Sequence, residues 1–146
     1  MLWLPQGAAH DLDTNGHIDN IACFLRPGVI ALLWAEPDEN SEQHARSAAA
    51  LTYLQSETDA RDRPLEVVKI FAPRPMKRRP DECVDLVGAP EDLAQAGDDL
   101  PGSYINFYIA NGGVIVPQFG DVERDAQAIA ILREQFPERE VVSNYI

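Results

Sequence analysis

The feature that most constrains the fold is a series of segments that occurs twice along the chain. Residues 21–34 hold two apolar stretches on either side of Arg26-Pro27-Gly28. Proline fixes one backbone dihedral angle and glycine tolerates positive φ, so these three residues predict a tight turn between two strands. A helix is predicted over 41–57, which is rich in helix formers, and a strand over 65–71, which is rich in branched side chains.

The same series returns after residue 103. It consists of a strand over 104–110, a turn at Asn111-Gly112-Gly113, a strand over 114–117, a helix that opens at Asp121 and ends at Pro137, and a strand over 140–143. Setting Gly28 beside Gly113, an offset of 85 residues, also aligns Val29-Ile30 with Val114-Ile115. The chain is therefore predicted to be an α+β protein of two strand-strand-helix-strand modules, at about 21–72 and 103–143. Repeated units usually bury their apolar faces against neighbouring units.

Side chains at helical spacing predict which face of each helix is buried. The first helix can be capped by Asn40 or Ser41, and the second by Asp121, because such side chains accept hydrogen bonds from the first free amides. The residues expected to face the core are Ala45, Ala48, Ala49, Leu51 and Leu54 in the first helix, and Val122, Ala126, Ile129, Leu132 and Phe136 in the second. Trp3 and Trp34 are also assigned to the core.

Residues 72–102 join the two modules and are predicted to form a loop or connector. Prolines and the basic residues Lys77, Arg78 and Arg79 crowd its first part, and an acidic stretch follows. The basic cluster is interpreted as a solvated loop rather than a binding patch. A connector of this length is either functional, for example in gating a substrate site, or without fixed structure.

The charge excludes some partners. Twelve basic residues against 24 acidic ones give a net charge of −12, which repels nucleic acid and anionic lipid and attracts small cations. No apolar run approaches the ~18 residues that a membrane span requires, and a cytoplasmic protein is predicted. Cys23 and Cys83 have no Cys or His partner at metal-ligand spacing, so two free thiols and no metal site are expected.

The most unusual local string is Asp13-Thr14-Asn15-Gly16-His17-Ile18-Asp19-Asn20, directly before the first apolar strand. In an extended backbone, side chains two residues apart project to the same side, so His17 and Asp19 would face one point in space. Histidine can donate and accept a proton near neutral pH, and a carboxylate can hold a planar cation through paired hydrogen bonds. The alternative is that both residues merely cap a turn. Asn106, Tyr108 and Asn111 could likewise line the mouth of a site or serve the structure alone.

Three segments, LWLPQG, DTNGHIDNIACFLRPG and SYINFYIANGGVIVPQFGD, resemble in order and spacing the agmatine deiminases and related bacterial peptidylarginine deiminase-like proteins. The resemblance covers the chain from Leu2 to about Val142. It implies the pentein fold, a propeller of five strand-strand-helix-strand modules, of which residues 1–146 would form a partial domain.

The resemblance also implies a chemistry that needs no cofactor. In that family a cysteine thiolate attacks the guanidinium carbon of a small cationic substrate, and a histidine protonates the departing ammonia and then activates water. His17 resembles the general acid/base, and Asp19 resembles a guanidinium-binding carboxylate. The nucleophile motif and a further substrate-binding acid do not match any part of this sequence, so the segment alone is predicted to be inactive. Cys23 resembles a packing position of the family, not the nucleophile.

Two alternatives stay open. The chain could be a shortened, non-catalytic relative that binds a cationic ligand or a protein, or forms homo-oligomers through uncovered module faces. The chemistry could also act on peptidyl-arginine or another arginine derivative instead of agmatine.

Overall fold

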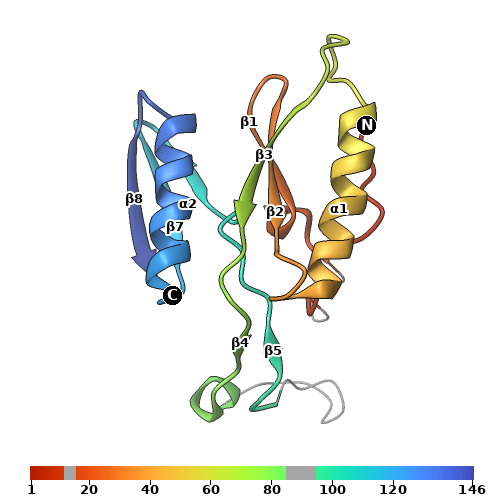
Figure 1. The fold of residues 1–146 in the computed structure, drawn as a ribbon. Helices are drawn as coiled ribbons and strands as arrows, with labels where there is room; N and C mark the ends of the chain where they lie inside the picture. The colour runs from red at the N-terminus through yellow and green to blue at the C-terminus, as the bar shows by residue number, and fades with distance from the viewer. Residues whose placement is uncertain (12–15, 85–94) are drawn as a thin grey trace.

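A computed structural model describes residues 1–11, 16–84 and 95–146 (Figure 1). The first module contains β1 (Ala22–Arg26), β2 (Val29–Trp34), α1 (Ser41–Ser56) and β3 (Glu66–Phe71). These strands form one sheet in the order β1-β2-β3, in which β1 runs antiparallel and β3 parallel to β2. Helix α1 begins after Asn40, whose side-chain oxygen accepts a hydrogen bond from the amide of Gln43 at 3.0 Å, as the sequence predicted.

The second module repeats this arrangement. It contains β6 (Tyr108–Ala110), β7 (Gly113–Gln118), α2 (Val122–Gln135) and β8 (Glu140–Tyr145), in a sheet of order β6-β7-β8 with the same strand directions. Asp121 caps α2 by accepting a hydrogen bond from the amide of Arg124. The prediction of an α+β chain with two strand-strand-helix-strand units is confirmed.

The predicted alignment of the two modules is wrong by one residue. The amide of Glu66 donates to the carbonyl of Gly28, and the amide of Glu140 donates to that of Gly112, each at 2.9 Å. Both glycines have positive φ, 83° and 80°. Gly112 is therefore the counterpart of Gly28, at an offset of 84 residues. The alignment based on the Val-Ile pairs is one residue out of register. Because successive side chains of a strand point to opposite faces, this shift matches residues that lie on opposite faces of their sheets.

The strand predicted over 104–110 is shorter, since only Tyr108–Ala110 pair with β7. Tyr104 and Ile105 lie in a turn and are 0% and 1% exposed. Their apolar character reflects burial and not strand pairing. The remaining predicted strands agree with the structure to within two residues at each end, β8 continuing to Tyr145.

The buried face of each helix was predicted only in part: Leu54, Leu132 and Phe136 are buried as predicted, but some other predicted positions are exposed. The buried residues are Gln43, Ser47, Ala50 and Leu54 in α1, and Asp125, Ala128 and Leu132 in α2. Val122 is 83% exposed. The apolar pattern missed the polar residues in each buried face, because these have internal partners: Gln43, for example, accepts a hydrogen bond from the amide of Ala9 and donates one to Ser47.

One hydrophobic core spans the two modules, with residues from β2, α1, β3, β7, α2 and β8. Helix α2 packs against β8 of its own sheet and also against β3 of the first sheet, and all six residues of β2 are buried. Figure 1 shows α1 and α2 on opposite sides of the first sheet. Trp34 is buried as predicted, but Trp3 is 75% exposed, and its core assignment is wrong.

The second sheet is open on the face that corresponds to the covered face of the first. Tyr108, Ile115 and Val142 adjoin across its three strands and are 67%, 43% and 43% exposed. By register their counterparts are Cys23, Ala31 and Val68, which are partly or fully buried.

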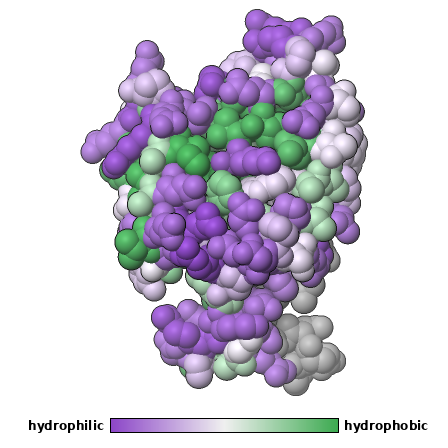
Figure 2. All heavy atoms as spheres, in the orientation of Figure 1, coloured by the Kyte–Doolittle hydropathy of each residue, from purple (hydrophilic) through white to green (hydrophobic). Residues whose placement is uncertain are grey.

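The connector is more regular than predicted. Strands β4 (Met76–Lys77) and β5 (Asp99–Leu100) pair antiparallel, and a 3-10 helix, η2 (Pro80–Cys83), follows β4. This ribbon extends beyond both modules in Figure 1, and its end is largely hydrophilic in Figure 2. Residues 85–94 of the connector lie outside the described part. In the ranges that the structure describes, neither helix is long and apolar enough to cross a membrane.

Candidate active site

His17 and Asp19 lie together on the turn that leads into β1. The imidazole Nδ1 is 3.8 Å from a carboxylate oxygen of Asp19, and the two side chains are 55% and 61% exposed. The backbone between them is not extended as expected, because Ile18–Asn20 form a 3-10 helix, η1. A tight turn therefore brings together the two groups that alternation along a strand was predicted to align. Residues 12–15 of the string identified from the sequence lie outside the described residues.

A buried carboxylate holds this turn. Asp11 is 8% exposed, and its Oδ2 accepts hydrogen bonds from the amide of His17 at 2.9 Å and from the side-chain amide of Asn20 at 3.4 Å. The sequence analysis missed Asp11, because nothing in its local pattern separates a buried carboxylate from the many exposed ones. The available signal was its place six residues before His17, within reach of a turn whose first amides need acceptors.

The segment before the turn is fixed by close backbone contact and by α1. Gly7 and Gly16 touch: a Cβ atom on Gly7 would lie 2.4 Å from the Cα of Gly16, which itself has a φ of 80°. Arg46 of α1 donates to the carbonyls of Gly7 and Ala8 at 3.1 and 2.8 Å. The backbone that enters the turn at Gly16 therefore packs against the segment at Gly7 and Ala8, a strap that Arg46 of α1 holds in place.

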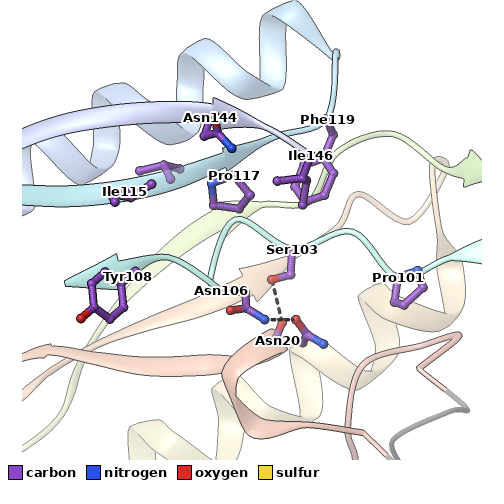
Figure 3. A pocket seen from close by; sticks show the side chains of 11 residues that line it. Asn20, Pro101, Ser103, Asn106, Tyr108, Ile115, Pro117, Phe119, Asn144 and Ile146 are labelled. Carbon is purple, nitrogen blue, oxygen red and sulfur yellow. Dashed lines mark hydrogen bonds between the residues drawn. The ribbon is translucent and has the colours of Figure 1, made fainter. Parts of the chain in front are cut away.

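Asn20 links the turn to the second module (Figure 3). Ser103 Oγ donates to the backbone carbonyl of Asn20 at 2.8 Å, and the side-chain nitrogen of Asn106 donates to the side-chain oxygen of Asn20 at 3.1 Å. Beside these contacts is a hollow of about 450 Å³ that lies against the open face of the second sheet. It is lined by Asn20, Ser103, Asn106, Tyr108, Ile115 and further residues of β7 and the C-terminal end.

The polar residues considered for the mouth of a site separate into two groups. Asn106 and Tyr108 line the hollow, whereas Asn111 belongs to the turn between β6 and β7. Among the described residues of their turn, Asn20 lines the hollow and His17 and Asp19 do not.

Cys23 is poorly suited to act as a nucleophile. It lies on β1, packs against the core while partly buried, and its Sγ is 3.6 Å from the carbonyl of Phe24. Burial, together with the charge of Asp19, raises the pKa of its thiol, which lowers the thiolate fraction at neutral pH. Cys83 lies on η2, and both cysteines are free as predicted.

The two side chains of the site combine a group that can carry a proton, the imidazole, with a carboxylate that can bind a cation. In the described ranges no three His, Cys, Asp or Glu side chains gather closely enough to hold a metal ion. An exposed imidazole and carboxylate on a tied turn can exchange a proton with, and bind, a ligand that approaches from solvent.

Comparison with known proteins places this geometry in context. The sequence model of the Porphyromonas-type peptidyl-arginine deiminase family matches residues 1–146. Agmatine deiminases from Medicago truncatula and Stutzerimonas stutzeri are 44% and 46% identical to the chain over 145 residues, which is 97% of this chain and 38% of each relative. A solved structure described as the agmatine deiminase of Enterococcus faecalis catalyzing its reaction is 36% identical with a TM-score of 0.85, over 99% of this chain and 39% of that one.

The chain thus spans 38% of the length of the curated relatives that it matches.

Proposed function

Because the chain belongs to the Porphyromonas-type peptidyl-arginine deiminase family, we propose that it supplies His17 and Asp19 to a site that hydrolyses the guanidinium group of agmatine. The products are N-carbamoylputrescine and ammonia. The observation that carries the proposal is the 3.8 Å pairing of an exposed imidazole with an exposed carboxylate on a turn tied to Asp11 and to the second module.

The proposed roles follow the chemistry of the two side chains. Asp19 accepts hydrogen bonds from the planar guanidinium and holds its carbon in place for attack by a cysteine thiolate. His17 gives a proton to the nitrogen that leaves as ammonia. It then takes a proton from water, whose oxygen attacks the carbon and displaces the thiolate to leave the carbamoyl group.

The nucleophile in this proposal is not a cysteine of the chain. A raised thiol pKa and a position inside the sheet both disfavour Cys23, and Cys83 lies on the connector, where no hydrogen bond or ion pair in the described ranges joins it to the turn of His17. The 146 residues alone are therefore expected to be inactive, and the cysteine is expected from a part of the protein that this sequence does not contain.

The open sheet face supports a larger ring of modules. The face formed by Tyr108, Ile115 and Val142 corresponds to one that is covered in the first module. In the proposed five-module propeller a further strand-strand-helix-strand unit covers it, as the second module covers the first. The net charge of −12 favours encounter with a cationic substrate.

The test is agmatine turnover by the complete gene product and its variants. His17→Ala and Asp19→Asn should each reduce kcat/KM by more than about 100-fold, since acid-base groups contribute about 10²–10⁴. The matched control is His10→Ala, because His10 also lies 3.8 Å from an aspartate, Asp99, but outside the turn. Wild-type turnover by His17→Ala would refute the assignment. Peptidyl-arginine and free arginine in the same assay decide the substrate.

A non-catalytic binding or oligomerisation module is the second candidate, and the same open face favours it. If this face mediates self-association, the chain should sediment as a concentration-dependent oligomer, and Ile115→Lys should return it to a monomer. A monomer at all concentrations would count against this candidate.

A further inference from the structure

Asp11 and Asp125 are the acidic residues that are buried as whole residues in the described part of the chain. A buried carboxylate is costly unless hydrogen bonds compensate it, so its partners indicate what it stabilises. Asp125 binds the phenol of Tyr104 and the amides of Phe119 and Gly120, all within the second module. Asp11 instead binds His17 and Asn20, at the two ends of the turn that carries the candidate site.

We propose that Asp11 is the positioning residue of the site: its carboxylate fixes the turn so that the side chains of His17 and Asp19 face the same substrate. This proposal rests on the proposed function of those two residues. Asp11 acts through the backbone amide of His17 and the side chain of Asn20, and no contact between its carboxylate and the imidazole is required.

The turn needs such support because it is short. Helix η1 has three residues, and the side chain of His17, which occupies its N-cap position, makes no capping hydrogen bond. The amide of Asn20 reaches the carbonyl of His17 at 3.3 Å, and that of Ile21 reaches Ile18 at 2.9 Å, so the turn's internal bonds are few. With both ends tied to one oxygen of Asp11, the residues between them cannot unwind without breaking a partly buried, charge-assisted hydrogen bond.

The second module completes the fixation. Asn20 is bonded on three sides: its side-chain amide donates to Asp11, its side-chain oxygen accepts from Asn106, and its carbonyl accepts from Ser103. On the other side, the contact of Gly7 with Gly16 fixes the backbone that enters the turn. Asp11 thus joins the strap held by α1 to the turn that meets the second module.

The proposal predicts a difference between two substitutions. Asp11→Ala removes the hydrogen bonds to His17 and Asn20, whereas Asp11→Asn can place its carbonyl oxygen where Oδ2 lies and keep these two donors satisfied. A displacement of about 1 Å of catalytic groups can cost about 100-fold in rate. In the complete gene product, Asp11→Ala should therefore lower kcat for agmatine by about 10–100-fold with a smaller change in KM, and Asp11→Asn should restore most of kcat.

The control is Asp59→Ala. Asp59 also accepts backbone amide hydrogen bonds, from Arg61 and Arg63 at 2.8 and 3.1 Å, in a loop after α1. It should leave kcat unchanged, and its Tm shows what the loss of such a carboxylate does to stability alone. A loss of kcat in Asp11→Ala beyond that control, with rescue by asparagine, supports positioning.

Two results separate the failures. If His17→Ala is inactive but Asp11→Ala keeps the wild-type kcat, the positioning role is refuted and the proposed function stands. If His17→Ala is fully active, the proposed function itself fails. Should Asp11→Ala not fold, Asn20→Ala replaces it, because it removes the side-chain hydrogen bond between Asn20 and Asp11: a kcat loss of about 3–10-fold is expected, and an unchanged kcat overturns the proposal.

Discussion

Replacing Asp125 should unfold the second module at a markedly lower temperature. Its carboxylate is 5% exposed and accepts three hydrogen bonds, from the hydroxyl of Tyr104 at 2.6 Å and from the amides of Phe119 and Gly120 at 3.0 and 3.1 Å. Asp125→Ala leaves three donors without this acceptor, of which the Tyr104 hydroxyl is buried and the two amides are partly buried. A side chain on the first turn of α2 thus holds the segment that links β7 to the helix.

The magnitude follows from those three bonds. A hydrogen bond to a charged group contributes about 1.5–3 kcal/mol net, and removing the buried charge returns part of its desolvation cost, so a loss of about 3–5 kcal/mol is expected. With an unfolding entropy of about 2.1 cal/mol/K per residue, this corresponds to a fall in Tm of roughly 10–15 °C for a chain of this length. Thermal unfolding followed by circular dichroism measures it.

Tyr104→Phe is the matched control because it removes one donor and leaves the two amides bonded. It should lower stability by about 1–2 kcal/mol, and Asp125→Asn by about 1–3 kcal/mol, since the amide keeps one acceptor oxygen. In a double-mutant cycle the effects of Tyr104→Phe and Asp125→Ala should be less than additive. A stability within about 1 kcal/mol of wild type for Asp125→Ala would refute the reasoning.

Three further predictions concern titrating groups. The Arg63 side chain, through its hydrogen bond, lowers the pKa of Asp59 to about 2, so the stability that this pair contributes should be present above about pH 4 and be lost as the pH falls to 2; Asp59→Asn should abolish that acid dependence. Burial, then the bond to Asp125, raises the pKa of Tyr104, so wild type but not Tyr104→Phe should lose stability as the pH rises above about 10. Cys23 should react slowly with thiol reagents at pH 7 because burial raises its pKa, and Cys23→Ser should keep the proposed deiminase activity of the complete gene product.

The local parts of the fold could be predicted because local signals determine them. The turn at Arg26-Pro27-Gly28 and the helix caps Asn40 and Asp121 depend on the conformational preferences of a few neighbouring residues, and the structure has all three. The buried face of each helix was harder to predict. Apolar spacing identified each helix and part of its buried side, but it missed Gln43 and Asp125, which are buried through partners distant in sequence.

The candidate site shows the same limit. His17 and Asp19 were identified from residue type and resemblance, yet the backbone that pairs them is a 3-10 turn and not a strand. A single acidic residue in an acidic chain gives no sign that it is buried, so Asp11 could be found only from the structure. The pairing of β4 with β5 was missed for a related reason: each strand has two residues, too few to show alternation.

The two modules are linked in both stability and the proposed function. Helix α2 contacts β3, and every residue of β2 is buried, so the first sheet depends on the second module for its cover. The turn of His17 depends on it as well, because Ser103 and Asn106 bind Asn20. The second module holds neither His17 nor Asp19, but loss of its packing would release one end of the turn that carries them. Separating the modules should therefore disorder the candidate site while the N-cap of α1 at Asn40 stays formed, because the hydrogen bond of that cap lies within the first module.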